Sequence, residues 1–179
     1  MTICVGIDNG LGGGIVALDN LKVLYKGIMP VVKGVKRNEY DVKGIVNVLK
    51  SLQKQAKTNG DSLFVMLEKS LIMPISGRIA VASTAYGNGV FEGVLTSLGI
   101  PYQVVRPTEW QKVVLKGMDT SDTKKASIIF CSRRFPAEDW TPSVRAKQEH
   151  TGLCDATCIA VYGQLISKIG LAPSWSEDF

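Results

Sequence analysis

The first 30 residues alternate apolar segments with short turns. Residues 2–8, 14–20 and 22–30 are rich in Ile, Val and Leu, a composition typical of strands. The stretch NGLGG between the first two segments is a turn signal. Because the links are short, we expect these three strands to form an antiparallel meander.

The period changes to that of a helix in the segment 39–60. Asp41 is a suitable N-cap, and Gly60 is a suitable stop. The apolar residues that follow helical spacing are Val42, Ile45, Val46, Leu49, Leu52 and Ala56. We therefore expect a helix that buries one apolar face.

The rest of the chain alternates strands and helices. The nearly continuous apolar run SLFVMLEKS predicts a buried central strand that ends at Glu68. The later elements are a helix over 77–98, a strand over 100–107, helices over 108–115 and 120–135, a polar loop over 137–149 and a helix over 151–170. Thr120 or Ser121 is the expected cap of the 120–135 helix.

This order predicts an α/β fold in one domain over residues 1–179. A three-stranded antiparallel meander continues into parallel strands, which gives a mixed five-stranded sheet flanked by helices. A final helix that packs across the sheet centre would bring its residues close to the first and fourth strands.

Composition narrows the function classes only slightly. The chain has 179 residues, 45% hydrophobic and 21% charged, with a net charge of +5 and a pI of about 9.0. Basic character permits nucleic-acid binding without proving it. No apolar run reaches the roughly 20 residues of a membrane helix, and MTICVGIDNG lacks signal-peptide features. We expect an intracellular, soluble protein that is not secreted.

One histidine and two cysteines recur every four residues near the last helix. His150, Cys154 and Cys158 would share a helical face and could begin a zinc site. No fourth ligand is obvious, and the neighbours are small and apolar. Cysteine used as a small buried hydrophobe is the favoured alternative.

Three acids interrupt otherwise apolar surroundings. Asp8 lies on the first strand, Glu68 ends the fourth, and Asp155 lies on the last helix. Each one alone is explained by a turn, a strand end or the helix dipole. If the strands are neighbours, the three carboxylates cluster, repel one another and resist ionisation unless a cation joins them. Mg²⁺ is such a cation, because it binds carboxylate oxygens.

Four stretches together resemble the RuvC-type Holliday junction resolvases of the ribonuclease H-like superfamily. They are GIDNGLGGGIVALD, FVMLEKS, AYGNGVFEGVLTSLGIPYQVVRPTEWQKVV and HTGLCDATCIAVYG. The match runs through nearly the whole chain in the right order and is nearest to the branch found in phages and some organelles. The specific part is the combination of GID, a strand-end Glu, V-R-P-x-x-W-x-K and H-x-G-x-x-D-A.

The resemblance implies a ribonuclease H-like fold and a homodimeric endonuclease of DNA recombination and repair. Its substrate would be branched DNA in the form of a four-way junction. Cleavage would require Mg²⁺ or Mn²⁺, with two ions taking part in the reaction. Asp8, Glu68 and Asp155 fall on the metal-binding acids of the family. The glycine-rich turn at 10–14 would lie beside the metals.

The chain departs from the family in one place. Relatives usually carry a fourth acid about one turn before the final aspartate, where this chain has Thr151 and Gly152. Either three acids suffice with help from His150, or one ligand has been lost. His150 is therefore a candidate catalytic residue, since imidazole can ligate a metal or move protons near neutral pH.

Basic residues are the expected DNA contacts. Lys69 and Arg78 would reach phosphates near the junction, and Lys124 and Lys125 follow a helix cap. Lys112 belongs to the V-R-P-x-x-W-x-K motif. Apolar wedges can open base steps, and the candidates for such a wedge are Met73, Pro74, Tyr86 and Phe91, although core or dimer contacts are the commoner use of such residues.

Three alternatives stay open. The fold could serve a general nuclease of flaps and forks, or a junction-binding protein with weakened catalysis, which the missing acid favours. GIDNGLGGGIVALD also resembles the first phosphate loop of actin-like sugar kinases and chaperone ATPases. Those proteins need two such domains, and this chain shows no repeat.

Overall fold

The computed structural model describes residues 2–35, 37–70 and 77–168. Its strands are β1 Thr2–Asp8, β2 Gly14–Asp19, β3 Lys22–Ile28, β4 Val31–Lys33, β5 Asn38–Tyr40, β6 Ser62–Glu68 and β7 Tyr102–Val105. Its helices are α1 Val42–Asn59, α2 Arg78–Ser97, α3 Pro107–Val114, α4 Thr123–Arg134 and α5 Thr151–Lys168.

Five strands form the central sheet in the order β3-β2-β1-β6-β7. The β1–β2 and β2–β3 pairs are antiparallel, and the β1–β6 and β6–β7 pairs are parallel. The expected meander and mixed five-stranded sheet are therefore confirmed. Because β1 and β6 are parallel neighbours, Asp8 and Glu68 end adjacent strands at the same edge of the sheet.

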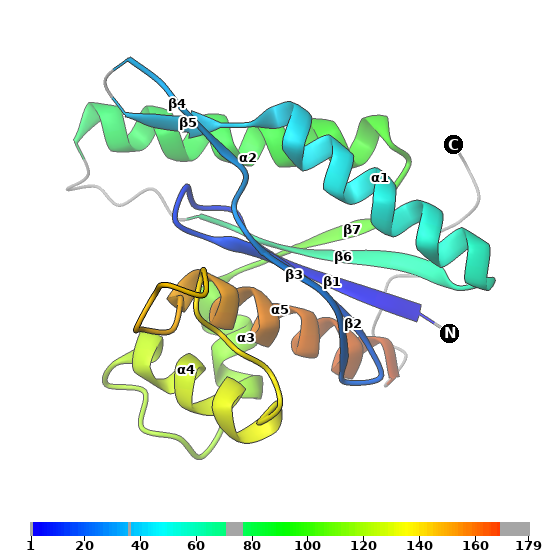
Figure 1. Cartoon of the computed structure of the whole chain (residues 1–179), viewed down its shortest axis with the longest axis vertical. Helices are drawn as coiled ribbons and strands as arrows, with labels where there is room; N and C mark the ends of the chain where they lie inside the picture. Colours follow the sequence, from blue (N-terminus) through cyan, green and yellow to red (C-terminus); the bar gives the residue numbers. More distant parts are fainter. Residues whose placement is uncertain (1, 36, 71–76, 169–179) are drawn as a thin grey trace.

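Helices cover both faces of the sheet (Figure 1). One face packs its alternate apolar residues, including Ile3, Val5 and Ile7, against α1 and α2. The other face packs Cys4, Phe64 and Met66 against α3, α4 and α5. This alternation explains why β1 and β6 read as continuous apolar runs, since both faces are buried.

Helix α5 lies directly on β1, and a glycine makes this approach possible. A Cβ on Gly6 would lie 2.0 Å from the carbonyl oxygen of Ala156 and 2.4 Å from the amide nitrogen of Ala160. Only glycine leaves room for the helix backbone at this distance. The close packing brings the first turns of α5, and with them Asp155, towards the end of β1.

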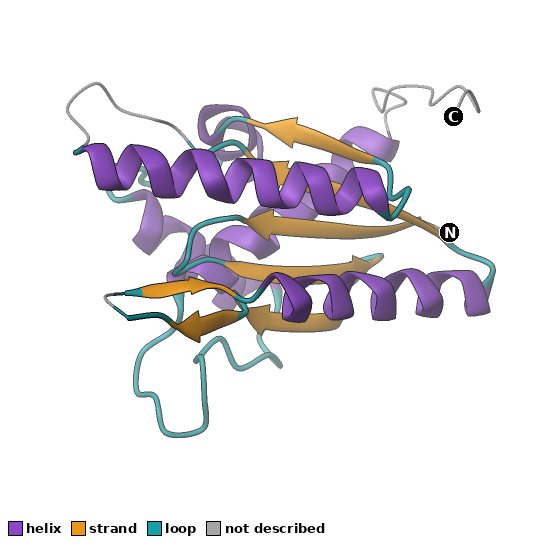
Figure 2. Cartoon of the chain, turned by 90° about the horizontal axis from the view of Figure 1, so that it is seen from above, coloured by secondary structure: helices purple, strands orange, loops and turns teal. Residues whose placement is uncertain are grey.

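Two local expectations are corrected. A small antiparallel hairpin, β4–β5, lies between the meander and α1 and was not predicted (Figure 2). The cap of α4 is Asp122 rather than Thr120 or Ser121, because the Asp122 carboxylate accepts from the Lys125 amide at 3.1 Å. The caps of α1 are as predicted: Asp41 accepts from the Gly44 amide, and Gly60 adopts a left-handed conformation with φ 70°.

None of the helices in the described ranges combines the length and the hydropathy that crossing a bilayer requires.

Candidate active site

Asp8 stands at the end of β1 beside the glycine-rich turn that leads into β2. The amide of Gly10 donates to Asp8 Oδ1 at 3.2 Å. A Cβ on Gly13 would lie 2.0 Å from the carbonyl oxygen of Asp8, so only glycine fits there. The turn thus folds back tightly over Asp8.

The same turn also packs against the start of α5. A Cβ on Gly152 would lie 2.4 Å from the carbonyl oxygen of Gly12 and 2.6 Å from Gly13 Cα. No side chain fits at residue 152 in this arrangement. The backbone at the start of α5 therefore packs directly on the glycine-rich turn.

Glu68 leaves the sheet at the end of β6, next to Val105 of β7. Its Oε1 accepts a hydrogen bond of 2.8 Å from the indole Nε1 of Trp110, a buried residue of α3. Burial, with repulsion from Asp8 and Asp155, raises the pKa of Glu68 to about 8, although the Trp110 bond opposes this rise.

Asp155 enters from α5. Burial raises its pKa to about 6, with a further contribution from Asp8, while Ser127 and Lys124 of α4 act in the opposite direction. The pKa of Asp8 is raised too, chiefly by burial, against the Gly10 bond and the positive charges of His150 and Lys124. The three carboxylates thus interact electrostatically and resist ionisation, as the sequence predicts.

These acids have no salt-bridge partner of their own within the described part of the chain. Their donor set fits a hard divalent cation, because Mg²⁺ takes carboxylate oxygens and the charge of the ion would offset their repulsion. Across the described residues, however, no group of three or more His, Cys, Asp or Glu side chains is already arranged to hold a metal ion.

His150 occupies the position just before α5. Its Nδ1 accepts from the amide of Leu153 at 3.2 Å, which is the bond of a helix N-cap. Burial lowers the pKa of His150, and the charge of Asp8 opposes this effect. When Nδ1 accepts, the neutral ring carries its proton on Nε2 and presents a donor there.

The cysteines that share spacing with His150 lie elsewhere. Cys154 and Cys158 belong to α5 and are fully buried in the core, together with Cys131 and Cys4. Cys131 Sγ donates to the carbonyl oxygen of Cys154 at 3.6 Å. The structure therefore separates the cysteines, as core residues, from the half-buried histidine.

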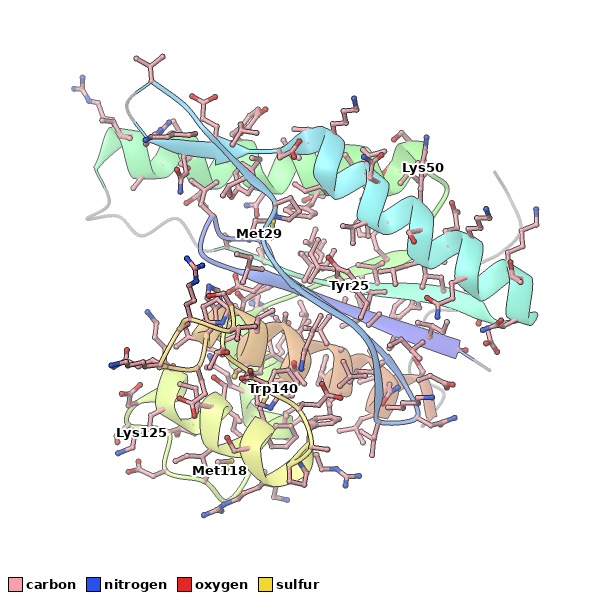
Figure 3. All side chains as sticks on the ribbon, in the orientation of Figure 1. Tyr25, Met29, Lys50, Met118, Lys125 and Trp140 are labelled. Atoms are coloured by element: carbon pink, nitrogen blue, oxygen red, sulfur yellow. The ribbon has the colours of Figure 1, made fainter. Side chains whose placement is uncertain are left out.

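The basic residues predicted to contact DNA differ in where they lie relative to the three acids. Lys124 interacts electrostatically with Asp8 and Asp155, whereas Lys125 lies on the outer side of α4 (Figure 3). Lys69 and Arg78 are exposed on either side of the undescribed residues 71–76.

Lys112 lies on α3. It lines a cavity of about 420 Å³ between α3 and the start of α4, together with Lys116, Thr120 and Thr123. This cavity is distinct from the carboxylate site, because none of the three acids lines it.

Of the four possible wedge residues, the structure describes two. Phe91 is fully buried against the sheet, which makes it a core residue. Tyr86 is 57% exposed and keeps its side chain available for contact. Met73 and Pro74 lie outside the described residues.

Sequence reasoning missed two residues of this site. Trp110 was noted as part of a motif without a role, and Asn9 was not singled out. Asn9 is 1% exposed and hydrogen-bonded to three other segments. The signal for Asn9 was its polar amide directly after an apolar strand.

Comparison with solved structures identifies the fold. The chain superposes on Thermus thermophilus RuvC in complex with a Holliday junction substrate with a TM-score of 0.60, 14% identity and coverage of 95% of this chain and 97% of that one. A second Thermus thermophilus RuvC structure gives a TM-score of 0.57 and 15% identity, covering 94% and 96%. No family model and no curated protein matches the chain. The fold is ribonuclease H-like, as expected, and at this identity the likeness establishes the fold alone.

Proposed function

We propose that this chain is a metal-dependent, structure-selective endonuclease that resolves four-way DNA junctions by paired phosphodiester hydrolysis. One observation carries the proposal: Asp8, Glu68 and Asp155 come from three separate elements and are half-buried, and the charge of Asp8 helps to raise the pKa of both Glu68 and Asp155. Such an arrangement costs folding free energy. Perturbed carboxylates gathered at one place are typical of functional sites.

Asp8, Glu68 and Asp155 are the residues that would hold Mg²⁺ or Mn²⁺, two ions in the full reaction. Bound ions would lower the pKa of water and stabilise charge on the attacking and leaving oxygens. The carboxylates themselves must be ionised to bind, so ion binding and deprotonation of Glu68 are coupled. His150 adds a nitrogen–hydrogen donor beside Asp8 in its neutral form.

Branched DNA is the proposed partner. Lys69, Arg78, Lys112, Lys124 and Lys125 would contact phosphates, and one solved structure of this fold contains a Holliday junction substrate. A homodimer suits a substrate that is cut symmetrically in two strands. Membership of the phage and organelle branch stays a prediction, as does a place inside the cell with DNA.

A second candidate function is junction binding with weakened catalysis. One observation favours it: of the two positions where relatives would carry the fourth acid, Thr151 and Gly152, the second has no space for a side chain. A nuclease that cuts flaps and forks equally well is the remaining alternative.

The test is cleavage of an end-labelled four-way junction with Mg²⁺, Mn²⁺ or EDTA. Linear duplex and a flap substrate serve as comparison, and Asp8→Asn, Glu68→Gln and Asp155→Asn as variants. We expect metal-dependent paired nicks in the junction, lost in each variant. Equal cutting of the flap would select the general nuclease. Junction binding without cutting in either metal would select the binding protein.

A further inference from the structure

Asn9 lies directly after Asp8 and ties three distant segments to the end of β1. Its Nδ2 donates to Asn88 Oδ1 at 2.7 Å, and its Oδ1 accepts from the Ser70 hydroxyl. Its backbone carbonyl accepts from the Tyr40 hydroxyl at 2.7 Å. The side chain is 1% exposed, so these partners replace water entirely.

The two side-chain partners of Asn9 come from the segment after Glu68 and from α2. Ser70 lies two residues after Glu68, in the chain that leaves β6. Asn88 lies in the middle of α2 and also donates from Nδ2 to the Ser70 carbonyl at 3.5 Å. Asn9, Ser70 and Asn88 therefore form a closed set of contacts, which we call the Asn9 cluster.

Tyr40 and α2 pack against each other next to this cluster. A Cβ on Gly87 would lie 2.5 Å from the Tyr40 hydroxyl, so α2 approaches Tyr40 as closely as a glycine allows. The Tyr40 ring also meets the Phe91 ring edge to face, with centroids 6.2 Å apart. The Asn9 cluster is thus supported by rigid packing.

A buried amide is expensive unless each of its bonds is made, and a satisfied buried network specifies one arrangement. Here the specified arrangement is the position of the chain after Asp8 relative to the chain after Glu68. No member of the cluster is a charged residue or a candidate metal ligand. Its effect on the acids must therefore act through the backbone.

We propose that Asn9, Ser70 and Asn88 are positioning residues that set how the carboxylates of Asp8 and Glu68 face a shared metal site. The inference rests on the proposed function. Groups that orient metal ligands typically contribute 10–100-fold to metal affinity. We expect loss of one cluster bond to weaken Mn²⁺ binding by about 10-fold.

The experiment measures Mn²⁺ affinity of the full chain without DNA, by the electron paramagnetic resonance signal of free Mn²⁺. Asn88→Ala and Ser70→Ala each remove cluster bonds, and Ser70→Thr keeps the hydroxyl. Gln164→Ala is the matched control, because Gln164 is a buried amide that bonds the Leu18 carbonyl at 3.3 Å, remote from Asp8 along the meander. Thermal unfolding of every variant is recorded in parallel.

The proposal holds if Asn88→Ala and Ser70→Ala bind Mn²⁺ about 10-fold more weakly while Ser70→Thr and Gln164→Ala bind like the wild type. It is overturned if the cluster variants keep wild-type affinity, or if Gln164→Ala weakens binding as much. Should Asn88→Ala not fold, the half-buried Ser70 pair decides alone. A wild-type chain that binds no Mn²⁺ would refute the metal site of the proposed function, and the positioning role with it.

Discussion

Trp110 and Glu68 are joined by a 2.8 Å hydrogen bond from the indole Nε1 to the carboxylate Oε1. The bond connects α3 to the end of β6 across 42 positions of sequence. It favours the ionised carboxylate, while burial and the neighbouring acids raise the pKa of Glu68 to about 8. Through this bond, Trp110 of α3 favours the ionised form of Glu68, a proposed metal ligand.

Replacing Trp110 with Phe should raise the pKa of Glu68 further. A hydrogen bond to a charged group contributes about 1.5–3 kcal/mol, and 1.36 kcal/mol corresponds to about one pKa unit. In Trp110→Phe, the rising limb of the pH–rate profile of junction cleavage should move up by about one to two units. Cleavage rates between pH 6 and 9, at a fixed Mg²⁺ concentration below saturation where the ion and the proton compete for Glu68, measure this shift.

Trp140 provides the matched control. It is buried and packs edge to face on Phe135, but its Nε1 has no hydrogen-bond partner among the described residues. Trp140→Phe therefore removes a similar ring without removing a bond. Equal shifts in the two variants would show that ring packing, and not the hydrogen bond, controls Glu68.

The raised pKa of Glu68 also predicts how stability depends on pH. Between its ordinary value of 4.5 and its folded value of about 8, the folded state keeps a proton that the unfolded chain releases. Stability therefore falls as pH rises through this window, by at most about 1.4 kcal/mol per unit for one group. His150 acts in the opposite sense, since its pKa is lowered, but only below about pH 6.5.

The measurable window is consequently pH 6.5 to 8. In EDTA, the melting temperature of the wild-type chain should fall across it, and Glu68→Gln should flatten the slope. Adding Mg²⁺ should also reduce the slope, because a bound ion favours the ionised carboxylate. A Glu68→Gln variant that keeps the full wild-type slope would contradict the assignment.

Much of the fold could be predicted because its signals are local. The short turns defined the meander, and the 3.6-residue period with Asp41 and Gly60 defined α1. The β4–β5 hairpin was missed because each strand has only three residues and carries charges such as Lys33 and Glu39. Three cap-forming residues in succession, Thr120 to Asp122, made the start of α4 ambiguous until the backbone geometry was known.

The candidate site also contains residues that a local sequence signal reveals and residues whose roles depend on distant partners. Asp8, Glu68 and Asp155 were identifiable, because a charge in an apolar segment needs an explanation wherever it lies. The roles of Trp110 and Asn9 depend on partners 42 and 79 positions away, which no local pattern reveals. Gly6 carried a readable signal, since a glycine inside an apolar strand often marks a close backbone approach.

Lys125 and Lys50 offer a matched test of the DNA-binding face. Lys125 lies on α4, and Lys50 lies on α1, which covers the opposite face of the sheet (Figures 1 and 3). Both are exposed. If Lys125 contacts a phosphate, Lys125→Gln should weaken junction binding and lower the slope of log affinity against log salt by about 1.

The measurement is junction affinity in Ca²⁺ or EDTA at several salt concentrations. Lys50→Gln changes the net charge equally and should leave the slope unchanged. Identical slopes for the two variants would mean that only overall charge, and not the position of Lys125, affects binding.

Substitutions of His150 can distinguish a structural role of this residue from a chemical one. As the N-cap of α5 its Nδ1 accepts from the Leu153 amide, and replacing a cap with alanine costs about 1 kcal/mol. Asparagine is also a good cap, but it cannot take up a proton near neutral pH. His150→Asn should therefore keep the melting temperature of the wild type, whereas His150→Ala should lower it.

Cleavage then decides the chemical role. If His150 assists the reaction, His150→Asn should lose cleavage at saturating Mg²⁺ by about 10²-fold, the low end for general acid–base catalysis, while still binding the junction. If His150 serves only as a cap, His150→Asn should cleave at the wild-type rate and only His150→Ala should be impaired. Because the helix that His150 caps also carries Asp155, that second outcome would make the imidazole a support for the acid and leave three carboxylates as the whole catalytic set.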